Sequence, residues 1–352
     1  MKSRFSAKTP SVENKSIENN SVKTGVLLTN LGSPEQPTTS ALRRYLREFL
    51  SDPRVVEIPR LIWIIILYGI ILPIRPKKSA KLYQSVWTEN GAPLLVISQA
   101  QKEAVAAKLA QQYGNDVIVD LAMRYGEPSI NSVLQKFQQQ GVNKLVVLPL
   151  YPQYAGPTTA STFDAVSQEL QKWRYVPNLH FINSYHSNSH YIKALANTVS
   201  EHINKHGKPD KLVLSYHGMP ELFYQWGDPY YDFCQITTNL LKKELMTRSV
   251  ALSDDDFVMT FQSRFGKAKW LQPYTDETLE NLAKQGTRHL AIISPAFSAD
   301  CLETLEELEH ENRDIFMQAG GEQYHYITAL NDREDHIEAL VNILSPTLNS
   351  SY

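Results

Sequence analysis

The chain has 352 residues, 42% of them hydrophobic, and a formal net charge of −2. This length suits two domains of ordinary size, each with its own core. The hydrophobic content argues against a disordered chain, and the near-neutral charge argues against nucleic-acid binding through bulk electrostatics. The two cysteines, Cys234 and Cys301, lack the spacing of a metal knuckle or a redox pair, which is typical of a reducing cytoplasm.

Residues 1–22 are rich in Ser, Asn and Lys and lack the apolar segment of a signal peptide, so we expect a flexible tail. A helical pattern follows at Ser40–Leu50. The most hydrophobic run, Leu61–Ile74, is too short to span a bilayer, which takes about 20 apolar residues. A cluster of basic residues comes after it, namely Arg75, Lys77, Lys78 and Lys81.

The run at residues 61–74 suits either a buried core helix or an exposed apolar lip that touches a membrane or a greasy ligand. Its basic flank favours the lip, because lysine and arginine attract anionic headgroups. We therefore expect a cytoplasmic protein with a peripheral contact on the inner face of the cytoplasmic membrane.

Three short segments recur in the same order along the chain, which indicates two related halves. The matched pairs are Val26–Pro34 with Leu212–Pro220, Ala122–Gly126 with Gln262–Gly266, and Gly141–Leu148 with Gly286–Ile293. Helical patterns at Ser98–Tyr113 and Asp232–Met246 lie between them. The sequence thus predicts an α/β fold of two doubly wound, Rossmann-like parallel-sheet domains that face each other across a cleft.

The two predicted domains, residues 23–194 and 195–352, differ in length between the matched segments. The chain takes 92 positions from Gly32 to Arg124 but 46 from Gly218 to Arg264. We assign the difference to an insertion at about residues 38–90 that overhangs the cleft and carries the lip. The second domain ends in a predicted C-terminal helix.

His217 ends an apolar run and directly precedes a Gly-x-Pro turn. This position is the carboxyl end of a strand, where open α/β sheets bind ligands, and histidine suits proton transfer or metal binding. The alternative is a histidine that caps the strand for structural reasons. Leu31 holds the equivalent place in the first half, so one wall of the cleft presents an aliphatic group and the other an imidazole.

A second apolar run, Leu290–Ile293, leads into a predicted helix from Asp300 onward. On that helix four carboxylates fall within about 80° of one another, namely Asp300, Glu303, Glu307 and Glu311. A solvated acidic face is the common explanation of such a stripe. Because the helix begins at a strand end, however, a histidine and a carboxylate can meet there to bind a metal ion or transfer protons.

At these residues the chain closely resembles the ferrochelatases, which insert ferrous iron into protoporphyrin IX to form haem. The resemblance runs from about residue 24 to 345. Its most specific segments are Ser215–Pro220, Phe261–Gly266, Trp270–Pro273 and Ser298–Glu303, with Leu28–Pro34 and Tyr151–Tyr154 also matching.

The resemblance implies that His217 is the pocket histidine and Glu303 its acidic partner, both serving metal binding and catalysis. It places Asp300 and Glu307 on acidic positions that lead away from the metal, and we add Glu311 to this proton or iron relay. The residues matched to the porphyrin pocket are Leu31, Tyr83, Arg124 and Trp270. Where Leu31 stands, some relatives have a tyrosine that can approach the metal.

Some ferrochelatases bind an iron–sulfur cluster through three cysteines in a C-terminal extension. No cysteine follows Cys301 here, so we expect no cluster and no prosthetic group, with Fe²⁺ as a substrate.

The expected function is therefore insertion of Fe²⁺ into protoporphyrin IX, the final step of haem synthesis. A chelatase for coproporphyrin or another tetrapyrrole is the alternative among enzymes. The apolar lip favours a hydrophobic porphyrin over a heavily carboxylated corrinoid precursor, while the residues alone do not distinguish protoporphyrin from coproporphyrin. A non-catalytic porphyrin or haem carrier is the alternative from another class, although a carrier has no need of a carboxylate path. The residues alone leave open from which side iron arrives.

Overall fold

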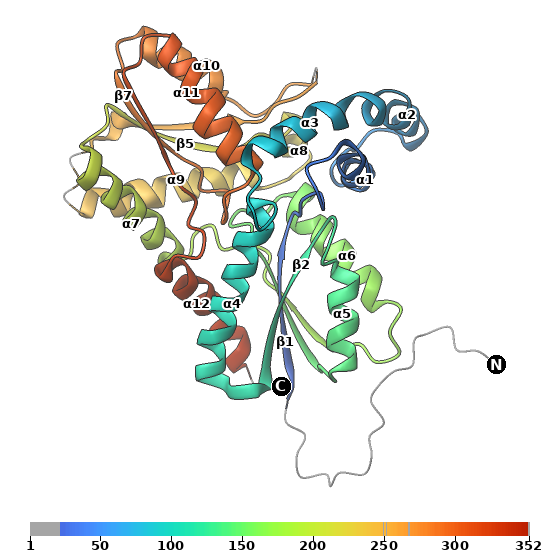
Figure 1. The fold of residues 1–352 in the computed structure, drawn as a ribbon. Helices are drawn as coiled ribbons and strands as arrows, with labels where there is room; N and C mark the ends of the chain where they lie inside the picture. The colour runs from blue at the N-terminus through green and yellow to red at the C-terminus, as the bar shows by residue number, and fades with distance from the viewer. Residues whose placement is uncertain (1–21, 249, 251, 267, 351–352) are drawn as a thin grey trace.

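The computed structural model describes residues 22–350, apart from residues 249, 251 and 267. These residues contain two four-stranded sheets with the orders β2-β1-β3-β4 and β6-β5-β7-β8. All neighbouring strands are parallel, and helices flank both sheets (Figure 1). The predicted architecture of two doubly wound α/β halves is therefore confirmed. The expected tail, residues 1–22, lies outside the described residues except for its last position.

The first half contains the first sheet and the large insertion. Its strands are β1 (Thr24–Asn30), β2 (Val117–Met123), β3 (Lys144–Pro149) and β4 (Asn178–Phe181). The inserted segments are α1 (Thr39–Leu50), α2 (Arg60–Ile66), the π-helix η1 (Leu67–Ile71) and α3 (Leu72–Val86). The remaining elements are α4 (Pro93–Tyr113), η2 (Gly114–Asp116), α5 (Ile130–Gln139), η3 (Gly156–Ala160) and α6 (Ser161–Leu170).

The second half repeats this plan after the connecting helix α7 (Ser189–His206). Its strands are β5 (Lys211–His217), β6 (Phe257–Gln262), β7 (His289–Ile293) and β8 (Gln323–Ile327). Its other elements are α8 (Glu221–Gln225), α9 (Tyr230–Thr247), η4 (Asp254–Asp256), α10 (Thr275–Lys284), the π-helix η5 (Glu303–Glu311), α11 (Asn312–Gln318) and α12 (Glu334–Asn349).

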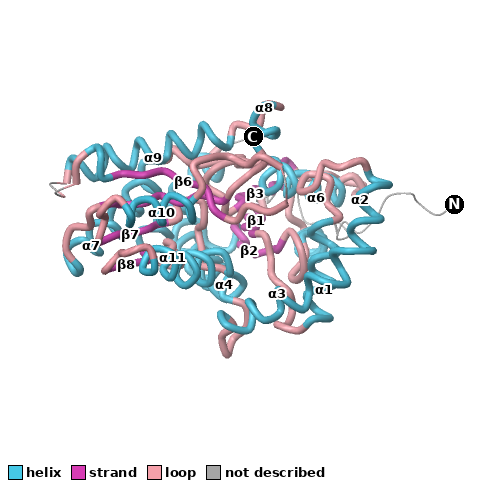
Figure 2. Tube along the Cα trace, turned by 90° about the horizontal axis from the view of Figure 1, so that it is seen from above, coloured by secondary structure: helices cyan, strands magenta, loops and turns pink. Residues whose placement is uncertain are grey.

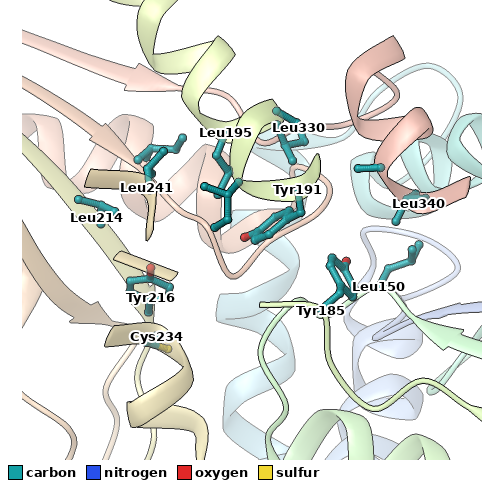
Figure 3. Packing of buried hydrophobic residues seen from close by; sticks show 14 of the residues in the cluster. Leu150, Tyr185, Tyr191, Leu195, Leu214, Tyr216, Cys234, Leu241, Leu330 and Leu340 are labelled. Carbon is teal, nitrogen blue, oxygen red and sulfur yellow. The ribbon is translucent and has the colours of Figure 1, made fainter. Parts of the chain in front are cut away.

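Successive strand residues alternate between two apolar layers, because side chains along a strand point to opposite faces. In β1, Leu27 packs toward α5 and α6, whereas Val26 and Leu28 join the layer formed with α4. That layer continues through α12, α7 and α9 to the second sheet, with Tyr191, Leu195, Leu241 and Leu340 among its members (Figure 3). One core thus joins the two halves, while α10 and α11 cover the outer face of the second sheet.

The strand register confirms the repeat but shifts the alignment of one matched pair, Ala122–Gly126 with Gln262–Gly266, by two residues. Thr29 lies opposite Ala122 in the first sheet, and the equivalent Ser215 lies opposite Thr260 in the second. Ala122 therefore corresponds to Thr260, two residues before Gln262, with which sequence similarity pairs it. A hydrogen bond repeats with the corrected register, since the amides of Met123 and Phe261 donate to the carbonyls of Pro128 and Pro273 at 2.7 and 2.8 Å.

The insertion lies beyond the upper ends of β1 and β2 in Figure 1 and at one side of the molecule in Figure 2. Its outward side chains form the apolar lip, consisting of Leu61, Ile62, Ile64, Ile65, Tyr68, Ile70 and Ile74, which are 41–81% exposed. Only Trp63, Leu67 and Leu72 of this region form a small buried cluster against α1. The exposure excludes a core helix for most of the run.

The structure also bears on the predicted domain boundary and on membrane-spanning segments. Residues 194 and 195, where the sequence divides into its predicted domains, both lie in α7, and α12 packs back onto α4 and β3 of the first half. Within the part of the chain that the structure describes, no helix has the length and hydropathy needed to cross a membrane.

Candidate active site

His217 is the last residue of β5 and lies beside Gln262 of β6 in the parallel register. The side chain is partly buried, and its Nδ1 lies 2.7 Å from the carbonyl oxygen of Gly218. A carbonyl can only accept a hydrogen bond, so Nδ1 carries the proton. In the neutral ring, Nε2 therefore presents the free lone pair.

The turn after His217 depends on Gly218 and Trp270. A Cβ at Gly218 would lie 2.5 Å from the carbonyl oxygen of Gln262 and 3.1 Å from the Trp270 ring, so only glycine fits. Trp270 is 5% exposed, and its indole donates to the carbonyl of Phe265 at 3.0 Å. Trp270, expected in the porphyrin pocket, thus packs behind the turn that positions His217.

The acidic helix differs from the prediction in both its start and its type. It begins at Leu302 instead of Asp300, and residues 303–311 form a π-helix with i→i+5 hydrogen bonds. A turn of more than four residues still leaves Glu303, Glu307 and Glu311 on one side of η5. The predicted stripe thus has three members on the helix, without Asp300.

Glu303 lines a small cavity between the two halves. The cavity measures about 10 Å³, room for one water molecule, and Leu31, Tyr45, Tyr83 and Cys301 contribute to its wall. Burial raises the pKa of the Cys301 thiol, and the neighbouring Glu303 raises it further, so the thiol stays protonated. Leu31, Tyr83 and Glu303 are therefore brought together as the sequence predicts, while Tyr45 and Cys301 are additions.

The helix α3 of the insertion forms part of the wall of this cavity. It packs against η5 of the second half and contributes Tyr83 to the lining. Arg75 of α3 also lies 6.0 Å from the centre of the Phe265 ring. The insertion therefore contacts the second half next to the cavity that Tyr83 and Glu303 line.

Glu307 is held by residues at the end of β6. Ser263 donates to its carboxylate from the backbone nitrogen at 2.7 Å and also from Oγ, while Gln262 Nε2 lies 3.4 Å from Oε2. The same Gln262 nitrogen donates to the Glu303 carbonyl at 2.9 Å, which ties the two glutamates together. Ser263 adopts a φ of 64°, unusual for a non-glycine residue and common at functional sites.

Burial raises the pKa of Glu307 to about 7, although the bonds from Ser263 oppose that shift; the nearby charge of Glu303 adds to it. A carboxyl group with this pKa exchanges protons readily near neutral pH. On its outer side Glu307 lines a second cavity of about 200 Å³, together with Glu311, Arg264 and Asp276.

Asp300 lines neither cavity. Its carboxylate accepts hydrogen bonds from Tyr326 Oη at 2.6 Å, Asn331 Nδ2 at 2.7 Å, Thr304 Oγ1 at 3.0 Å and the backbone of Ala329 at 3.2 Å. These bonds connect the start of η5 to the segment after β8. Its contacts are those of a buried anchor.

Arg124 is likewise engaged inside the first half. Its Nη2 lies 2.5 Å from a carboxylate oxygen of Asp52, and its Nε donates to Ser161 Oγ at 2.6 Å. The guanidinium also stacks over the Tyr125 ring at 4.5 Å. The residue is thus fixed in a network below the insertion.

No group of three or more histidine, cysteine or acidic side chains surrounds a common point in the described ranges 22–248, 250, 252–266 and 268–350. The candidate site therefore consists of a histidine with a free Nε2 at the end of β5, the Glu303 carboxylate at the small cavity, and a second carboxylate, Glu307, that Ser263 and Gln262 hold. Such a set can accept protons and offer loose oxygen ligands.

A family model described as Ferrochelatase matches residues 23–348. The chain belongs to the ferrochelatase family. It is 60% identical to Ferrochelatase 2 of Shewanella oneidensis, with 93% of this chain and 98% of that protein covered, and 57% identical to the Ferrochelatase of Shewanella denitrificans over the same shares. Members of this family are lyases of haem biosynthesis that act on a porphyrin and ferrous iron.

The fold has relatives beyond the family. SirB from Bacillus subtilis with Fe³⁺ superposes with a TM-score of 0.56 at 14% identity, covering 93% of this chain and 96% of that one. At this identity the likeness concerns the fold alone. The predicted resemblance to ferrochelatases is confirmed by the family match and the close relatives.

Gln262 and Ser263 are functional candidates to which the sequence analysis assigns no role. They belong to the segment Phe261–Gly266 that carries the resemblance, so their place in a specific motif was the available signal. Their partner, Glu307, lies 44 residues beyond Ser263 in the chain, and only the folded structure pairs them.

Proposed function

We propose that this chain inserts Fe²⁺ into protoporphyrin IX, and that His217 and Glu303 carry the reaction. The observation that supports this most is the arrangement at the strand ends, where an imidazole with a free Nε2 follows β5 and Glu303 faces an aliphatic wall at Leu31. Metal insertion replaces two pyrrole protons with one divalent ion. The site must therefore remove protons and loosen the hydration shell of iron.

In this proposal His217 accepts a pyrrole proton at Nε2 while the Gly218 carbonyl holds Nδ1–H. The fixed tautomer aims the basic nitrogen away from β5, so no proton rearrangement is needed before transfer. Glu303 orients the incoming ion or takes the second proton. Porphyrin nitrogens complete the coordination of iron, which agrees with a site that has few protein ligands.

Protons then leave through Glu307 and Glu311. Gln262 holds the backbone carbonyl of Glu303 and the carboxylate of Glu307 in place, and Glu307 lines the cavity of about 200 Å³ that Glu311 also lines. The pKa of about 7 at Glu307 suits a group that both accepts and releases a proton at neutral pH. Asp300 holds the start of η5, so we assign it a positioning role beside this path.

In this proposal the substrate binds where Leu31 and Tyr83 line the small cavity. The aliphatic Leu31 then packs against one face of the porphyrin. Such a grip favours a bent macrocycle whose nitrogen lone pairs are exposed.

The apolar lip supports protoporphyrin over coproporphyrin or a corrinoid precursor, which carry more carboxylates. We further propose that the lip rests on the surface of the cytoplasmic membrane, from which an apolar porphyrin reaches the site. Burying one large apolar side chain contributes roughly 1.5–3 kcal/mol, so a few lip residues with neighbouring lysines suffice for reversible attachment.

The direct test is the loss of protoporphyrin fluorescence when Fe²⁺ is added anaerobically to the full chain. We expect turnover with Fe²⁺ and protoporphyrin, and slower turnover with coproporphyrin. Binding without turnover would make the chain a carrier, and faster metallation of coproporphyrin would reassign the substrate. Parallel assays with Zn²⁺ and Co²⁺ measure metal selectivity.

A further inference from the structure

Four histidines gather at the edge of the second sheet that lies opposite to His217. They are His202 and His206 of α7, His289 at the start of β7 and His325 of β8; we call them the imidazole cluster. Since His289 begins its strand and His217 ends the neighbouring one, roughly 20 Å of strand separates the cluster from the active site. The cluster is thus independent of the proposed chelatase chemistry.

Three of these rings form a nearly equilateral triangle. The ring centres of His202 and His206 lie 4.7 Å apart, those of His202 and His325 5.0 Å, and those of His206 and His325 4.6 Å. The fourth ring, His289, lies 5.2 Å from His325. When imidazoles bind one tetrahedral metal ion through nitrogens at about 2.0–2.1 Å, their centres are roughly 5 Å apart, so the spacing suits a shared ion.

Two ring nitrogens of the cluster are buried and have no hydrogen-bond partner among the described residues. They are Nε2 of His202 and Nε2 of His289. Buried polar atoms normally have a partner, so these two nitrogens call for a ligand. Burial lowers the pKa of His202 to about 4 and also lowers that of His325, so both are neutral at pH 7, the form that binds metals.

The surroundings set limits on affinity and geometry. Lys205 and Arg313 add positive charge near the cluster, whereas the C-terminal end of α7 directs its partial negative charge toward a cation. As placed, no three described ligating side chains aim donor atoms at one point. Binding therefore requires the rings to turn about their side-chain torsions, and the exposed His206 is free to do so.

We propose that the imidazole cluster binds one divalent transition-metal ion of the class that prefers imidazole ligands, such as Zn²⁺, Ni²⁺ or Co²⁺. His202 and His206 are one helical turn apart and supply two ligands from the same face of α7. His325 supplies the third, and His289 lies beside it as the fourth. The ion then ties α7 to the edge strand β8 and stabilises the second half.

The test uses the full chain carrying His217→Ala and Glu303→Gln, which removes the proposed metal ligands of the active site. We expect calorimetric titration with Zn²⁺ to give one binding site, and Co²⁺ to give the visible absorption bands of a four-coordinate ion. His206→Gln and His325→Gln should each weaken the affinity at least about tenfold. His190→Gln, an exposed histidine in the first turn of the same helix, is the matched control and should leave affinity unchanged.

Thermal unfolding of each variant with and without Zn²⁺ separates loss of a ligand from loss of the fold. Added Zn²⁺ should raise the Tm of the His217→Ala, Glu303→Gln chain and leave that of its His206→Gln derivative unchanged. The proposal is overturned if the starting chain binds no Zn²⁺, or if His206→Gln and His325→Gln bind it as tightly as His190→Gln. Neither outcome bears on metal insertion, which depends on the opposite edge of the sheet.

Discussion

The two halves share strand order and direction, yet only the second carries the residues that we propose as catalytic. Leu31 follows β1 where His217 ends β5, and the first sheet has Arg124 in a closed network where the second has Gln262. The first half instead supplies the insertion, whose helix α3 forms part of the cavity wall through Tyr83. The repeated scaffold thus places Leu31 and His217 at equivalent strand ends. In our proposal Leu31 contacts the porphyrin and His217 accepts a proton.

The largest expected effect is the difference in turnover between variants of His217 and of Leu31, its counterpart in the first half. His217→Ala removes the proton acceptor and should lower turnover by about 10³-fold, within the range of general acid–base catalysis, while porphyrin binding persists. Leu31→Ala at the equivalent position removes only apolar contact and should mainly raise the KM. Steady-state metallation kinetics of both variants measure the contrast. Equal losses of turnover would mean that the two halves contribute alike.

The next effect concerns Glu303. Glu303→Gln keeps the shape of the side chain and removes its charge, so turnover should fall by about two orders of magnitude with little change in porphyrin affinity. Rapid-mixing absorbance and fluorescence titration separate the two quantities. Weaker porphyrin binding with intact turnover would reassign Glu303 to substrate binding.

The raised pKa of Glu307 leads us to expect that the free energy of unfolding depends on pH. Its pKa of about 7 in the folded protein exceeds the ordinary value of 4.5, so the stabilisation from its proton is complete below pH 4.5 and is lost as the pH rises through 7. Glu307→Gln should therefore gain stability relative to the parent as the pH rises, by about 3 kcal/mol at most. Urea unfolding at pH 5 and pH 8 measures this difference. Glu309→Gln on the same helix is the control, and an equal pH dependence in both variants would contradict the assignment.

The smallest expected effect on chemistry lies in the apolar lip. Leu61, Ile65 and Ile74 are 81%, 73% and 66% exposed, so their triple replacement by Ser should leave the Tm unchanged while weakening binding to anionic liposomes. The KM for membrane-delivered protoporphyrin should rise with kcat unchanged. Leu67 is 1% exposed and should not be replaced, because it belongs to the buried cluster beneath.

A matched control is Tyr175 with Val176, which are exposed apolar residues outside the insertion. Replacing both by Ser should not alter liposome binding. If this pair matters as much as the lip, attachment is not localised to residues 61–74.

Much of this contrast is readable from the sequence, because strand ends are marked by an apolar run followed by a turn. That pattern locates Leu31 and His217 in equivalent places, and the register of β1 and β5 agrees. The insertion is likewise visible as unequal spacing between matched segments. These features depend on local order along the chain.

Other features depend on packing that periodicity does not encode. An α-helical period from Asp300 does not predict that residues 303–311 form a π-helix, since that choice rests on backbone hydrogen bonds. The clamp of Ser263 on Glu307 and the anchoring of Asp300 by Tyr326 each join distant segments. The imidazole cluster also assembles from three separate elements.

The most direct test of the division between the halves is the protoporphyrin-dependent consumption of Fe²⁺, measured with the parent, His217→Ala and Leu31→Ala under anaerobic conditions. The account predicts stoichiometric haem formation by the parent, a loss of about 10³-fold in turnover for His217→Ala, and retained turnover for Leu31→Ala. Undiminished haem formation by His217→Ala would contradict the account.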